Sequence, residues 1–146
     1  MKKFNFPLDR ILQYRGNQVQ LEESKLERLF ATRGGIELRR RQLHLQRAEN
    51  ETALFASPSI ASSELAALDQ FRQFVDAQDH IMDRQLVQCD ARIAAQRTRV
   101  LEARRQHQLL EKLRDKRAAH WQSECDRELE QQAAESFLAQ WNRQGG

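Results

Sequence analysis

The amino-acid sequence predicts an all-α fold: a long antiparallel two-helix coiled-coil hairpin with an overhanging C-terminal helix. The first observation is a stretch from Ser63 to about Asn142 that contains neither Gly nor Pro. The second is the composition, because charged residues make up 31% and aromatic residues only 7% of the 146 residues, as in long helices. The third is a 3-4 spacing of apolar residues along that stretch, which is typical of a coiled-coil seam. The members of this seam are Leu65, Leu68, Val75, Met82, Leu86, Cys89, Ile93, Val100, Ala103 and Leu110.

Length and charge narrow the class of protein. A chain of 146 residues is expected to form one domain. The net charge of +3 would suit an acidic partner or nucleic acid, although so small a charge favours neither strongly. Cys89 and Cys125 are too far apart on one helix to form a disulfide. Together with the lack of a secretion signal and of an apolar run long enough to span a membrane, this indicates a cytoplasmic protein.

A first helix is expected over about residues 7–55. Pro7 suits the first turn of a helix, where its missing N–H is not needed. The three internal glycines lie off the seam and are expected to be tolerated in a continuous helix, at a cost of about 1 kcal/mol each relative to Ala. They are Gly16, Gly34 and Gly35. The 3-4 pattern keeps one phase throughout, through Leu8, Leu12, Arg15, Val19, Glu22, Leu26, Leu29, Arg33, Ile36, Arg40, Leu43, Arg47, Asn50 and Leu54.

The segment Ser57-Pro58-Ser59 predicts a turn over about residues 56–62. The residue before Pro58 is pushed out of the α region, so the first helix should end there. Ser62 or Ser63 can cap a second helix, expected over about residues 63–141. A connection this short favours two antiparallel neighbours.

The two patterns predict a register. With the turn centred near residue 59, the numbers of facing residues add up to about 118–119. Arg40 should then face Asp79 as an ion pair. The apolar pairs would be Leu54–Leu65, Leu43–Val75, Ile36–Met82, Leu29–Cys89, Leu26–Ile93, Val19–Val100 and Leu8–Leu110. Two layers fit less well, Arg33 with Leu86 and Arg47 with Arg72. Long arginine side chains can lie along the seam and reach outward.

No motif for catalysis, for a cofactor or for a metal is found. The glycine-rich loops that bind nucleotides are absent, and there is no C-x-x-C pair. The four histidines do not recur at metal-binding spacing; they are His44, His80, His107 and His120. A two-helix hairpin also offers no cleft for a small-molecule substrate. The sequence therefore predicts a binding protein that is not an enzyme.

The end of the second helix is expected to lack a partner within the chain. The first helix runs out at Leu8, which should face Leu110, so the residues after about Glu111 have nothing opposite them. The apolar residues left over are Leu113, Trp121, Leu129, Phe137, Leu138 and Trp141. Such a surface fits either dimerisation through the tail or docking on a larger assembly, of which docking is favoured.

The segment from Arg97 to Arg117 is basic, with eight Lys or Arg against three acidic residues. It can be read as a solvated helix face with pairs three residues apart, or as a stripe that binds phosphate. No aromatic residue is interleaved with it, which counts against single-stranded nucleic acid as a partner.

Two segments resemble one known family. Lys3-Phe4-Asn5-Phe6-Pro7-Leu8-Asp9-Arg10-Ile11-Leu12-Gln13-Tyr14-Arg15 is similar to the amino-terminal F-x-F-x-L-x-x-[IL]-L-x-x-R opening of the flagellar export protein FliJ family. Leu110-Glu111-Lys112-Leu113-Arg114-Asp115-Lys116-Arg117 resembles the L-E-K-L-[KR]-x-[KR]-[KR] segment of its second helix. The Asp-Glu pair that the family often has near the end of that helix is absent, and Glu135-Ser136 is the nearest counterpart.

The resemblance implies a cytoplasmic component of the flagellar type III export apparatus, at the inner membrane beneath the flagellum. Members of that family resemble the coiled-coil stalk of rotary ATPases. They act in the hexameric export ATPase ring, engage the cytoplasmic part of an export-gate membrane protein and handle export chaperones. The resemblance therefore implies a role in protein export and motility.

Two groups of contact residues are expected. The third of the hairpin nearest the turn should bind the export gate through His44, Phe71, Phe74, Gln78 and Met82. The chain termini and the paired region beside them should bind the ATPase through Phe4, Phe6, Leu113, Arg117, Trp121, Phe137, Leu138 and Trp141. Three alternatives stay open: an injectisome ATPase stalk, a basic coiled-coil protein that binds nucleic acid or ribosomes, and a structural homodimer.

Overall fold

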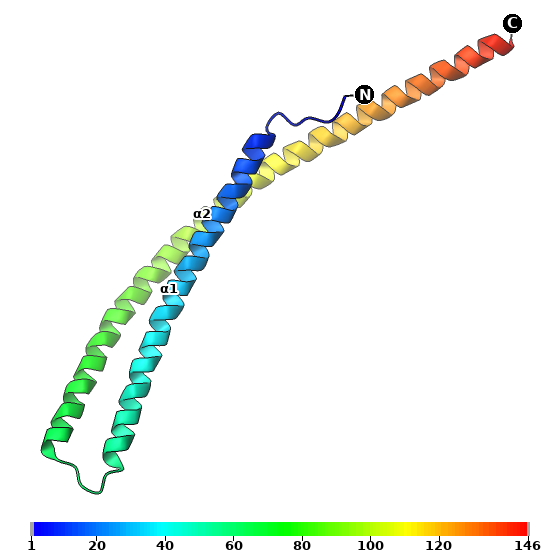
Figure 1. The fold of residues 1–146 in the computed structure, drawn as a ribbon. Helices are drawn as coiled ribbons and strands as arrows, with labels where there is room; N and C mark the ends of the chain where they lie inside the picture. Colours follow the sequence, from blue (N-terminus) through cyan, green and yellow to red (C-terminus); the bar gives the residue numbers. More distant parts are fainter. Residues whose placement is uncertain (1, 146) are drawn as a thin grey trace. The chain divides into compact units, whose positions relative to one another are not determined.

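The computed structural model describes residues 2–145 and contains two α-helices packed against each other, with no strand among these residues (Figure 1). Helix α1 spans Asp9–Phe55 and helix α2 spans Ser62–Gln144. The all-α hairpin predicted from the sequence is confirmed. The chain divides into two compact units. We call residues 21–101 the hairpin unit, and residues up to 20 together with those from 102 onward the terminal unit.

Both helices begin and end close to the predicted residues. Helix α1 starts at Asp9 rather than Pro7, because the Asp9 amide donates to the Phe6 carbonyl at 3.1 Å in a preceding turn. At its other end the Ser57 amide donates to the Leu54 carbonyl at 3.2 Å, which tightens the last turn before the proline. Helix α2 continues to Gln144, three residues beyond the predicted end, since no Gly or Pro interrupts it earlier.

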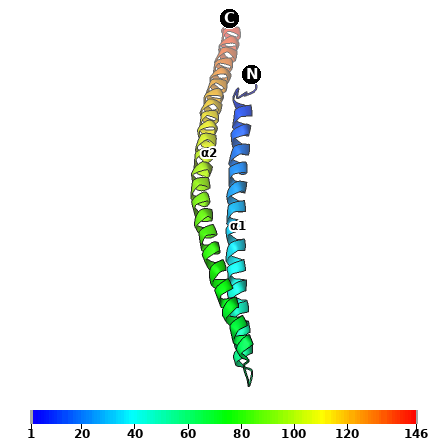
Figure 2. The same cartoon turned by 90° about the vertical axis from the view of Figure 1, so that its left-hand side faces the viewer.

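In the hairpin unit the two helices run antiparallel beside each other, coloured cyan and green in Figure 2. A buried residue recurs at every seventh position of α2, which is the repeat of a coiled coil. These residues are Leu68, Val75, Met82, Cys89 and Gln96. Val75 is 0% exposed. Ile36 of α1 packs in one cluster with Met82 and Cys89, as the predicted register requires.

Polar contacts confirm the same register. The Arg40 guanidinium lies 3.3 Å from the carboxylate of Asp79, the residue predicted to face it. The Cys89 thiol donates to the Leu29 carbonyl at 3.9 Å, and these two residues were also predicted to face each other. Arg33, which has Leu86 opposite in that register, reaches outward and binds Asp90 at 2.7 Å.

The terminal unit is built differently, because α2 is covered there partly by a segment that is not helical. We call residues 2–8 the strap. The Trp121 indole N–H donates to the Lys2 carbonyl at 3.0 Å, and its ring lies 6.0 Å from that of Phe4. Phe6 is buried and the Arg117 guanidinium lies 5.7 Å from its ring centre.

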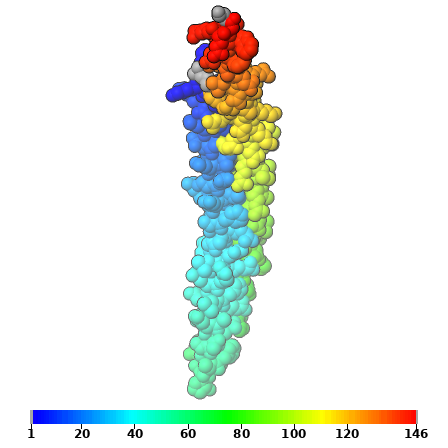
Figure 3. All heavy atoms as spheres, turned by 90° about the vertical axis from the view of Figure 1, so that its right-hand side faces the viewer, coloured from blue at the N-terminus to red at the C-terminus, as the bar shows by residue number. Residues whose placement is uncertain are grey.

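The strap corrects one prediction. Trp121 was expected to lack an intrachain partner because the first helix ends at Leu8, but the residues before that helix turn and pack against it. Leu113 is also half-buried rather than exposed. Only the segment after Cys125 fits the expectation, since residues 126–144 are all exposed. We call these residues the tail, and on the face drawn in Figure 3 no other segment covers its orange and red atoms.

Neither described helix contains a stretch long and apolar enough to cross a membrane.

Candidate interaction surfaces

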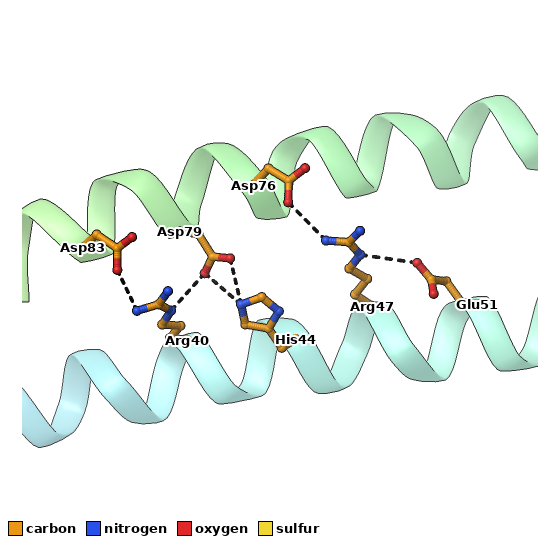
Figure 4. Close-up of polar contacts among 7 residues, drawn as sticks. All are labelled: Arg40, His44, Arg47, Glu51, Asp76, Asp79 and Asp83. Carbon is orange, nitrogen blue, oxygen red and sulfur yellow. Dashed lines mark hydrogen bonds and ion pairs between the residues drawn. The ribbon is translucent and has the colours of Figure 1, made fainter.

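One flank of the hairpin unit carries a ladder of ion pairs between α1 and α2 (Figure 4). Arg40 bridges two carboxylates, with Asp83 at 2.6 Å and Asp79 at 3.3 Å. Asp79 also lies 2.8 Å from Nε2 of His44. Arg47 repeats the arrangement one heptad further on, with Asp76 at 3.1 Å. We call this side the ion-paired flank.

Glu51 ends this ladder nearest the turn. Its carboxylate accepts from Arg72 Nε at 2.7 Å and from Arg47 Nε at 3.3 Å. The hydrogen bond from Arg72 is the main reason that the pKa of Glu51 lies below its ordinary value; burial opposes this shift, and the hydrogen bond from Arg47 adds to it. Arg47 and Arg72, which the predicted register places in one poorly fitting layer, therefore share a carboxylate. Exposed pairs of this kind contribute under about 1 kcal/mol each to stability. The main effects of the ladder are therefore to neutralise opposite charges and to fix the register of the two helices.

The other flank of the hairpin unit is hollowed and basic. A groove of about 390 Å³ is lined by Lys25, Arg28, Leu29, Thr32, Arg92, Ala95, Gln96 and Arg99. Thr32 and Arg92 also line a neighbouring hollow of about 230 Å³, with Ile36, Arg39, Gln85, Gln88 and Cys89. We call the two together the basic groove. None of its lining residues is acidic.

The cations of the basic groove are exposed to solvent. Lys25 lies 3.4 Å from Glu22. The other four cations are also exposed to solvent; they are Arg28, Arg39, Arg92 and Arg99. The two flanks of one hairpin thus differ: one carries a ladder of ion pairs between α1 and α2, and the other presents exposed cations around a groove.

Gln96 closes the floor of this groove and is the polar residue that the seam prediction missed. Its side-chain amide donates to the Glu22 carbonyl at 3.0 Å and also to the Glu22 carboxylate. That hydrogen bond is the main reason that the pKa of Glu22 lies below its ordinary value. The sequence did carry a signal, because Gln96 continues the seven-residue spacing that runs from Leu68 to Cys89.

The residues predicted to bind a gate protein fall into two groups. Phe71 and Phe74 stack with their ring centres 6.3 Å apart, and Phe74 is 51% exposed, as expected for side chains off the seam. Gln78 is half-buried, and His44 is exposed beside Asp79. Met82 is only 5% exposed and belongs to the core cluster. A partner could contact its side chain only after the helices separate.

The residues predicted to bind an ATPase also fall into two groups, both in the terminal unit. Phe4 of the strap packs against Trp121, Arg117 lies over the ring of Phe6, and Leu113 is half-buried on the same helix as Trp121. The three of these residues that lie in the tail are 57–65% exposed; they are Phe137, Leu138 and Trp141. The rings of Phe137 and Trp141 lie 6.4 Å apart.

Among residues 2–145, no group of three or more His, Cys, Asp or Glu side chains could hold a metal ion. No family model, no curated protein and no solved structure matches this chain.

Proposed function

We propose that this protein is a stalk-like adaptor of a flagellar type III export ATPase, which promotes the ATPase ring and links it to the export gate and to export chaperones. Two sequence segments support this assignment through their resemblance to the FliJ family. A helical hairpin is the architecture that the resemblance implies. The same proposal gives the protein a cytoplasmic site of action at the inner membrane.

The exposed tail is the observation that carries the proposal. Phe137 is 64% and Trp141 65% exposed, and both are large apolar side chains. Burying such a side chain contributes roughly 1.5–3 kcal/mol, so the tail offers a strong association surface. A single helix about 10–12 Å across also suits a narrow ring channel better than a helix pair does.

The tail is tested by Phe137→Ala together with Trp141→Ala, with ATP hydrolysis by the purified export ATPase as the measurement. We expect stimulation to be lost, because the two rings supply most of the exposed aromatic surface of the tail. Deleting residues 118–146 is a cruder test, since it also removes Trp121 and the contact with the strap. A cut after Glu128 keeps that contact and should have the same effect.

Leu38→Ala with Leu45→Ala is the matched control, because both leucines are exposed on α1 of the hairpin unit. This variant should stimulate the ATPase as the unmodified protein does. Full stimulation by the tail variant would show that the tail does not make the contact.

The stacked pair near the turn is the proposed contact with the gate. Phe71→Ala with Phe74→Ala should weaken binding to the cytoplasmic part of the gate protein and leave stimulation of the ATPase largely intact. Loss of both activities, accompanied by loss of helical circular dichroism, would mean that the substitutions disrupt the hairpin.

A further inference from the structure

We propose that the basic groove of one copy binds the acidic, aromatic tail of a second copy, so that the free protein forms a dimer by reciprocal exchange of tails. This goes beyond the adaptor function. It concerns what covers these two surfaces when no other protein is bound.

The groove has the chemistry of a site for an amphipathic helix. Its apolar lining residues are Leu29, Ala95, Ile36 and Cys89, of which Ile36 and Cys89 belong to the buried seam beneath the groove. Its rims carry Lys25, Arg28, Arg39, Arg92 and Arg99 without an acidic lining residue. A phosphate backbone would use the cations and leave the apolar lining residues wet, whereas an acidic helix with an apolar stripe would use both.

The tail, together with the two residues of α2 before it, has the charge and apolar surface that would complement the basic groove. Residues 124–135 contain five acidic residues and one basic residue, Arg127. Positions three and four apart share one face of a helix, and here that face combines carboxylates with apolar groups. Its members are Asp126, Glu130, Ala133, Phe137 and Trp141. All five are exposed, so this face of the tail and the basic groove are two complementary surfaces that are both open to solvent.

The occupant has to come from another copy. The tail and one wall of the groove belong to the same unbroken helix, α2, and a helical segment cannot fold back onto an earlier part of its own helix. If each copy inserts its tail into the groove of the other, the two contacts are equivalent and the assembly closes as a dimer.

Charge reversal on each side provides the test, with sedimentation equilibrium of the full chain as the measurement. Arg28→Glu with Arg92→Glu reverses the groove, and Asp126→Lys with Glu130→Lys reverses the tail. Each variant alone should dimerise about tenfold or more weakly than the unmodified chain, because like charges then oppose each other. An equimolar mixture of the two should regain dimerisation, since every groove then meets a tail of opposite charge.

Arg41→Glu with Arg84→Glu is the matched control, because it reverses two exposed arginines of the hairpin unit that do not line the groove. It should dimerise like the unmodified chain, and circular dichroism should show equal helix content in all variants. A monomer at every concentration, or a dimer indifferent to both reversals, would overturn the proposal. So would a mixture that stays monomeric.

This test is separate from that of the adaptor function. The groove variant keeps the tail intact and should still stimulate the ATPase. Loss of dimerisation in the groove variant with stimulation retained therefore supports the exchange of tails independently. Full stimulation by Phe137→Ala with Trp141→Ala would overturn the proposed ATPase contact and leave the result for the groove variant unchanged.

Discussion

The hairpin unit and the terminal unit cover the same helix in different ways. In the hairpin unit a second helix lies on α2, and buried residues recur every seven positions from Leu68 to Gln96. In the terminal unit the strap contacts α2 at Trp121, and the residues of α2 that are buried or half-buried there include Leu113, Trp121 and Cys125, separated by multiples of four. The spacing of buried residues on a helix therefore reflects the shape of what covers it. A heptad pattern reports a helical partner, and its loss does not mean that the helix is bare.

The largest expected effect is in the core of the hairpin unit. Met82→Ala removes a side chain that packs against Ile36 and Cys89, so it should lower the free energy of unfolding by about 2–5 kcal/mol. Urea unfolding followed by circular dichroism measures this. Leu109→Ala, at an exposed position of α2 in the terminal unit, should change stability by less than about 0.5 kcal/mol. Equal losses from the two substitutions would mean that the seam is not the core.

An intermediate effect is expected at the strap. Trp121→Ala removes both the ring contact with Phe4 and the hydrogen bond to Lys2, which together should contribute about 1–2 kcal/mol locally. Trypsin should then cleave after Lys2 or Lys3 faster, while global unfolding changes little. Trp121→Phe keeps a ring but loses the hydrogen-bond donor, so its cleavage rate should lie between those of the unmodified chain and Trp121→Ala. Unchanged cleavage in Trp121→Ala would contradict the contact.

Replacing glycine by alanine should change stability by smaller amounts, and the gain should differ between the two units. A methyl group added at Gly34 or Gly35 would meet no atom within 4 Å, so Ala at each should stabilise α1 by about 1 kcal/mol. A methyl group at Gly16, in the terminal unit, would lie 3.3 Å from Nε2 of His107. We therefore expect Gly16→Ala to gain less than either substitution in the hairpin unit. Thermal melts of the three single variants measure the difference, and equal gains would show that His107 moves aside freely.

The smallest effect is on the pH dependence of stability. The pKa of Glu51 is lowered by its arginine partners, so it contributes stability above its ordinary pKa of 4.5 and loses that contribution as the pH falls through the lower value in the folded state. Unfolding at about pH 6 and pH 3 should show a smaller drop for Glu51→Gln than for the unmodified chain. Glu102, whose pKa is lowered mainly by Arg105, makes the matching test in the terminal unit. A drop unchanged by Glu51→Gln would show that the carboxylate is equally solvated in both states.

Much of the hairpin could be predicted from the sequence, since helix boundaries and register follow from the heptad spacing and from Pro58. The strap could not, because its contacts depend on a segment without regular periodicity, in which Phe4 packs against Trp121 and Phe6 against Arg117, each more than a hundred residues away. The basic groove also escaped prediction. Its cations are spread over two helices, and only the register brings Arg28 and Arg92 to one flank. The ladder opposite was foreseen at Arg40 and Asp79 alone.

The two buried cysteines can report local opening of the structure, one in each unit. Cys89 is buried in the seam of the hairpin unit, and Cys125 is buried one turn beyond Trp121 in the terminal unit. A thiol reagent modifies a buried sulfur only during the moments when its cover lifts, so each labelling rate measures the free energy of one opening event. Cys125 should react first, because it lies in the terminal unit, where α2 is covered partly by a segment that is not helical, whereas Cys89 lies in the seam between two helices. The protein thus carries one natural thiol in each unit, and the labelling rate of each reports the local opening of that unit.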